Sequence, residues 1–109
     1  MGQNKVTFFE VRTFDDLVFT RRDFSAIDPA IADIILDSTP FQARVNFDTE
    51  FGDGTSASII YGKSAYSTKG KDGEYESFEV LYSDEEEPRG YETKEQLTLE
   101  FLRRSFDKL

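Results

Sequence analysis

The most regular alternation of apolar and polar residues lies between residues 41 and 47. Its two sides are Phe41, Ala43, Val45 and Phe47, against Gln42, Arg44 and Asn46. Successive side chains of a strand point to opposite faces, so this pattern predicts a strand with one buried and one wet face, which is typical of antiparallel sheets. Two further strands are expected over 55–67 and 75–82, after glycine-containing turns. Together the three segments predict a three-stranded antiparallel meander.

The same alternation indicates which residues of the other two strands point inward. They are Ala57, Ile59 and Tyr61 in the second strand and Phe78, Val80 and Tyr82 in the third. Gly62 interrupts the second strand, and a glycine inside a strand pattern is a signal for a bulge.

A helical period replaces the alternation in two places. Over 29–37, Asp28 is a good N-cap and Pro29 suits the first helical position. Its apolar stripe is Ile27, Ile31, Ile34 and Ile35. A second helix begins after Thr93, which forms a capping box with Gln96. Its predicted stripe is Leu99, Leu102, Phe106 and Leu109, widened by Leu97 and Phe101.

The N-terminal part of the chain is less regular. Residues 5–11 are rich in β-formers and predict a strand, whereas 13–20 fit either a turn or a second short strand that makes a hairpin with the first. We therefore expect a single α+β domain over 1–109, ordered strand or hairpin, helix, three strands, helix. It should have two layers, with both helices on one face of the antiparallel sheet. The predicted core is Ile31, Ile34, Ile35, Val45, Phe47, Ile59, Val80, Leu99, Leu102 and Phe106.

Composition argues against catalysis. The 109 residues include no His and no Cys, so the commonest general base, the thiol nucleophile and the preferred zinc ligands are all missing. Residues 48–59 superficially resemble a calcium loop, but Ile59 stands where the final Glu is required. We expect neither an enzyme nor a metal or cofactor site.

Charge gives the main functional indication. The formal net charge is −9, and residues 74–95 carry nine acidic against two basic residues. Within this segment, 83–92 are expected to form an acidic loop. This excess disfavours direct binding to nucleic acid or to anionic membranes, because both need Lys and Arg. No apolar run approaches the about 20 residues of a membrane span, and the N-terminus does not resemble a signal peptide. We expect a cytoplasmic protein.

The leading functional hypothesis is a non-enzymatic acidic protein that binds the basic surface of a protein partner. The partner class would be nucleic-acid-handling proteins, which this chain would inhibit stoichiometrically, as phage counter-defence, antirestriction or nuclease immunity proteins do. The residues expected at the interface are Asp84, Glu85, Glu86, Glu87, Glu74, Glu76, Glu92, Tyr75 and Tyr91.

Two alternatives remain open at the level of sequence. The acidic run can serve solubility alone. The second alternative follows from the first: the chain is a structural or accessory subunit that binds its partner through apolar or aromatic contacts, which high salt would not weaken.

Overall fold

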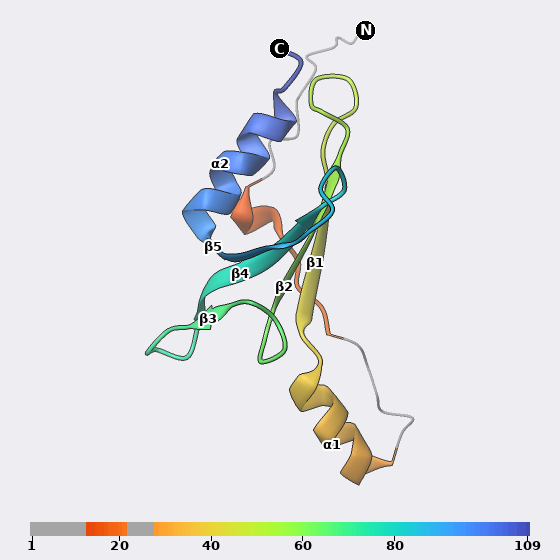
Figure 1. The fold of residues 1–109 in the computed structure, drawn as a ribbon, viewed down its shortest axis with the longest axis vertical. Coiled ribbons are helices and arrows are strands. Elements are labelled where there is room, and N and C mark those ends of the chain that lie inside the picture. Colours follow the sequence, from red (N-terminus) through yellow and green to blue (C-terminus); the bar gives the residue numbers. More distant parts are fainter. Residues whose placement is uncertain (1–12, 22–27) are drawn as a thin grey trace, which may run out of the picture.

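The computed structural model describes residues 13–21 and 28–109, and it has an antiparallel sheet with a helix packed on one face (Figure 1). The elements are the 3-10 helix η1 (Phe14–Asp16), α1 (Pro29–Ser38), β1 (Phe41–Asn46), β2 (Ser56–Tyr61), β3 (Thr68–Lys69), β4 (Tyr75–Tyr82), β5 (Arg89–Thr93) and α2 (Lys94–Ser105). The predicted α+β class is confirmed, and so is the meander, formed by β1, β2 and β4.

The longest strand, β4, has neighbours on both edges. Ser77 pairs with Thr68 of β3 on one edge and with Thr93 of β5 on the other. Val80 likewise pairs with Ile59 of β2 and with Arg89 of β5, so β2 and β3 lie along the same edge of β4, opposite β5. At the far side of the sheet, Thr20 forms an isolated antiparallel bridge with Gln42 of β1.

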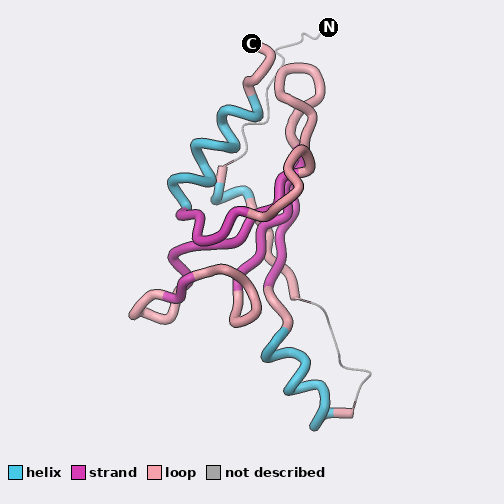
Figure 2. The backbone as a smooth tube through the Cα atoms, viewed as in Figure 1, coloured by secondary structure: helices cyan, strands magenta, loops and turns pink. Residues whose placement is uncertain are grey.

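Two strands differ from the sequence expectation. The predicted strand 55–67 ends at Tyr61, because Gly62 has a φ of 144° and starts a turn that leads to β3 (Figure 2). Gly62 therefore ends a strand and does not form a bulge within one. Residues 89–92, expected to be an acidic loop, belong to β5. Their composition has little strand propensity, so pairing with β4 is what makes them a strand.

The core lies between the sheet and α2. Its inward-facing residues align across the strands as Ala43–Ile59–Val80 and Val45–Ala57–Tyr82. From α2, the ring of Phe101 packs 5.4 Å from that of Phe47, measured between centroids. The predicted core positions Val45, Phe47, Ile59 and Val80 are confirmed as buried.

The buried face of α2 differs from the predicted one. The capping box of Thr93 and Gln96 is confirmed. The buried residues of the helix, however, are Leu97, Phe101, Arg104 and Ser105. Leu99 was predicted as core and is 68% exposed, and Leu102 and Phe106 are half-buried. The predicted and the observed stripe have the same helical period. A search for apolar residues alone does not find the observed stripe, because one of its members is an arginine.

Helix α1 also departs from the prediction. Asp28 caps it by accepting a hydrogen bond from the backbone N–H of Ala30 (3.0 Å). The helix projects beyond the end of β1 and does not cover the sheet face beside α2 (Figure 1). Ile31 and Ile34, both predicted as core, are 52% and 73% exposed, and Ile35 is half-buried. An amphipathic stripe shows that one side of a helix is apolar, but it does not set the angle at which the helix leaves its strand.

The predicted strand 5–11 lies outside the described residues. Of the ambiguous segment 13–20, residues 14–16 form η1, and the chain then runs extended to the bridge at Thr20. In the described part of the chain, no helix is long and apolar enough to cross a membrane.

Candidate functional site

A buried arginine organises the charges near the C-terminal end of α2. Arg104 is 1% exposed, and its Nε donates to Glu100 Oε2 (2.8 Å). Its Nη1 lies 3.1 Å from Asp53 Oδ2 and 3.1 Å from Asp84 Oδ1. The guanidinium stacks over the buried ring of Tyr82, 4.0 Å from its centroid. Carboxylates from three separate segments thus compensate one buried cation, as burial of a charge requires.

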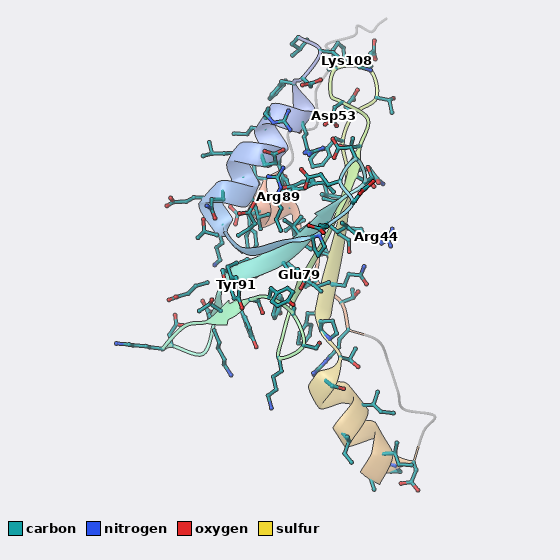
Figure 3. All side chains as sticks on the ribbon, viewed as in Figure 1. Arg44, Asp53, Glu79, Arg89, Tyr91 and Lys108 are labelled. Atoms are coloured by element: carbon teal, nitrogen blue, oxygen red, sulfur yellow. The ribbon has the colours of Figure 1, made fainter. Side chains whose placement is uncertain are left out.

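Arg89 of β5 joins this group. Its guanidinium makes a two-pronged contact with the carboxylate of Glu85, in which Nε donates to Oε1 at 2.9 Å. Its Nη1 lies 3.8 Å from Glu92, and its Cζ lies 4.9 Å from the Tyr82 ring centroid. We call the following set the arginine cluster: Asp53, Tyr82, Asp84, Glu85, Arg89, Glu92, Glu100 and Arg104. It ties the acidic loop between β4 and β5 to α2 and to the loop after β1 (Figure 3).

Two groups in the arginine cluster, Tyr82 and Glu100, have pKa values shifted by their surroundings. Burial raises the pKa of the Tyr82 hydroxyl far above its ordinary value, with the Glu100 carboxylate adding to the effect. The hydrogen bond from Arg103, followed by that from Arg104, lowers the pKa of Glu100. The charged form of Glu100 is therefore the stable one in the folded protein.

The opposite end of α2 is open. Three adjoining hollows of about 390, 500 and 440 Å³ all have Lys94, the first residue of the helix, in their lining. We call them together the Lys94 groove. The charged rim at the first hollow has four carboxylates, which belong to Asp72, Glu74, Glu76 and Glu95, and Asp15 lines the third hollow. Its floor is made by six aromatic rings, those of Phe14, Phe19, Phe41, Tyr61, Tyr75 and Phe78.

The rim of the Lys94 groove comes from two elements. The hairpin between β3 and β4 turns at Gly73, whose φ of 89° suits glycine, and it carries three of the carboxylates. The fourth, Glu95, lies in the first turn of α2. Among the residues that the structure describes, no ion pair involves any of these four carboxylates. This charge remains available to a partner, in contrast to that of the arginine cluster.

Tyr61 is the centre of the aromatic floor. Its ring centroid lies 5.0 Å from Phe19, 5.0 Å from Phe41, 4.8 Å from Tyr75 and 5.7 Å from Phe78. Burial, then the neighbouring Tyr75, raises the pKa of its hydroxyl, so Tyr61 is neutral at physiological pH. Of the five rings in this group, Phe78 is buried and the other four are half-buried.

The nine residues predicted to bind a partner separate into four places. Glu74, Tyr75 and Glu76 lie together in the Lys94 groove. Asp84, Glu85 and Glu92 belong to the arginine cluster, where arginines of the same chain pair with them. Glu86 and Glu87 are exposed on the loop between β4 and β5.

Tyr91 forms a separate exposed pair with Tyr66. The two ring centroids are 6.0 Å apart, and the backbone N–H of Tyr91 donates to the carbonyl of Tyr66 (2.9 Å). Tyr91 has a φ of 57°, an uncommon conformation for a residue with a side chain. It lies with Glu79 on the side of the sheet away from α2 (Figure 3). The nine predicted residues therefore do not form one continuous surface.

The sequence analysis missed several groove residues: Phe14, Phe19, Phe41, Tyr61, Asp72, Lys94 and Glu95. A signal for some of them was present, because the register that pairs Phe41 with Tyr61 follows from the meander and puts both on the face of Phe78. The contribution of η1 was not readable in this way. Within the described ranges, no group of three or more acidic residues is arranged to hold a metal ion.

Comparison with known proteins adds no relative. The chain matches no protein-family model, no curated protein and no solved structure.

Proposed function

We propose that this chain is a non-enzymatic binding protein that docks a basic protein partner in the Lys94 groove. The observation that carries the proposal is the combination of four carboxylates that have no ion pair within the described part of the chain and a floor of mostly half-buried aromatic rings. Aromatic residues are enriched where binding energy concentrates, and unpaired surface charge attracts a partner of opposite sign. The four carboxylates are exposed. Four of the six rings are partly buried and pack against the core, to which Phe78 itself belongs.

The partner class that fits this chemistry is a protein with a surface built for phosphates. Nucleases, restriction enzymes and RNA-guided effectors carry basic channels of that kind. A small domain of net charge −9 is steered toward such a channel and blocks it by occupancy. This would make the chain a cytoplasmic stoichiometric inhibitor, of the type used in phage counter-defence or nuclease immunity. The link to those biological roles is by analogy.

The test compares two charge reversals of equal size. Glu74→Lys with Glu76→Lys reverses the groove rim, and Glu86→Lys with Glu87→Lys reverses the exposed loop. A partner captured from the native host should bind the groove variant at least about tenfold more weakly, since each reversal turns an attraction into a repulsion. The loop variant should stay within about threefold of the natural chain. Asp84 and Glu85 are avoided, because reversing them would disturb the arginine cluster.

The result distinguishes three situations. A loss confined to the groove variant supports the proposal. Equal losses in both variants would mean that net charge, and not the groove, determines binding. Undiminished binding of both variants, or a partner without a basic surface, would overturn the proposal.

A second function, as an accessory subunit held by apolar contacts, is favoured by α1. This helix exposes Ile31 and Ile34 beyond the end of the sheet. A contact through these residues would persist in high salt, whereas one through the Lys94 groove would weaken. Ile34→Asp would abolish the former contact and leave the latter intact.

A further inference from the structure

The aromatic end of the Lys94 groove has the size and lining of a side-chain pocket. This hollow of about 500 Å³ lies within the range of ligand sites. Besides the six rings, its lining includes only two charged residues, Glu74 and Lys94. The faces of aromatic rings carry negative charge density, which attracts cations.

The chain already places its own cations over rings of this kind. Arg21 lies 4.8 Å from the ring centroid of Phe41, and the Lys94 amino group lies 5.3 Å from that of Phe14. Among the described residues, no cation of the chain is found over Tyr61 or Tyr75, two adjacent rings that line the hollow. These two rings are therefore free for a cation from outside.

Arginine fits this position better than lysine does. Its planar guanidinium stacks on aromatic faces and is more weakly hydrated than an ammonium group, so it loses less on leaving water. It also forms two parallel hydrogen bonds with a carboxylate, which Glu74 supplies at the rim. Within the chain itself, Arg104 shows the same combination of ring stacking and carboxylate pairing.

We infer that the Lys94 groove binds an arginine side chain of the partner, with the guanidinium over Tyr61 and Tyr75 and paired with Glu74. This inference rests on the proposed function and specifies the chemistry of its central contact. The remaining rim carboxylates attract the neighbouring basic residues of the partner. The Lys94 amino group repels the incoming cation and so weakens binding.

The experiment uses the full chain and two short peptides of equal charge, one of five arginines and one of five lysines, measured by calorimetric titration at low salt. The arginine peptide should bind about fivefold tighter or more, the size of one cation–π contact. Tyr75→Leu should remove this advantage while leaving the lysine peptide within about twofold. Tyr61→Leu provides a second variant. Tyr66→Leu, at an exposed tyrosine outside the groove, should keep the advantage.

Lys94→Gln gives an independent test with a matched control. It should raise the affinity for the arginine peptide more than Lys108→Gln does, although both remove one positive charge. Lys108 lies past the opposite end of α2, where its amino group donates a hydrogen bond to the carbonyl of Thr49 (Figure 3). Equal increases in the two variants would contradict the placement of the guanidinium.

The outcomes separate this inference from the function on which it rests. Two outcomes would overturn the inference alone: equal affinity for the two peptides, or an arginine advantage that survives both Tyr61→Leu and Tyr75→Leu. In either case, reversal of Glu74 and Glu76 would still weaken the binding of both peptides. No measurable binding of either peptide at low salt would overturn both. Thermal unfolding of each variant confirms that it is folded.

Discussion

The two ends of α2 are made of similar parts and differ in what covers them. Each end has a cation, several carboxylates and aromatic rings. At the C-terminal end, Arg104 is 1% exposed and its charge is compensated within the chain. At the N-terminal end, Lys94 is exposed and the carboxylates around it have no ion pair among the described residues. Enclosure, and not composition, distinguishes a structural charge network from a surface available to a partner.

The energetic consequence follows from desolvation. A buried cation that loses its partners is strongly destabilising, whereas surface charges contribute little to folding. Substitutions in the arginine cluster should therefore lower stability, and those in the Lys94 groove should mainly alter binding. The four predictions below test this distinction in urea unfolding, from the largest expected effect to the smallest.

The largest difference in the free energy of unfolding should be between substitutions of aromatic residues at the two ends of α2. Phe101→Ala should lower the free energy of unfolding by about 3 to 5 kcal/mol, because the side chain is fully buried against Phe47. Phe14→Ala, at a half-buried ring of the groove, should cost only about 1 to 2 kcal/mol. Equal losses would mean that the groove floor is part of the core.

The buried cation comes next. Arg104→Met should cost about 3 kcal/mol, since it leaves Asp53 without its cation and removes one of the cations that pair with Glu100. This value is at the lower end of the about 3 to 5 kcal/mol that breaking a buried ion pair costs. The reason is that Asp84, the third partner, is 48% exposed and water can solvate it. Arg103→Met is the matched control, and its exposed side chain should contribute less than about 1 kcal/mol. A cost below that of the control would refute the structural role of Arg104.

Acid should weaken the arginine cluster through Glu100. Its pKa in the folded protein lies below the ordinary value of 4.5, so its stabilising effect is complete above that pH and is lost as the pH falls further. Glu100→Gln should lower stability at neutral pH, and its difference from the natural chain should shrink in acid. If the difference in stability between the two chains did not depend on pH, the charge of Glu100 would not be what stabilises the fold.

The smallest contrast concerns two carboxylates of the acidic segment. Glu85→Gln should cost about 1 kcal/mol, because Glu85 makes a two-pronged contact with Arg89. Glu74→Gln should change stability by less than about 0.5 kcal/mol, as is usual for an exposed residue. If Glu74→Gln proved the more damaging, the assignment of the two regions would be reversed.

Much of the fold was readable from residues that are close together in the chain. The alternation over 41–47, the cap of α1 by Asp28 and the capping box at Thr93 are all observed. For the site, three neighbours in sequence, Glu74 to Glu76, line the same hollow, and their part in binding stays a prediction. These signals are reliable because a strand period, a cap or a turn depends on residues only a few positions apart.

What the tertiary structure alone decided depends on distant residues. The sequence shows an amphipathic α2 but not that Arg104 belongs to its buried face, because that requires Asp53, 51 positions away. It shows an acidic segment but not that Arg89 and Arg104 pair with part of it. It shows an apolar stripe on α1 but not that Ile34 stays exposed. Local periodicity thus determined which elements form, whereas the desolvation and pairing of groups far apart in the chain determined which faces are buried and which charges remain open.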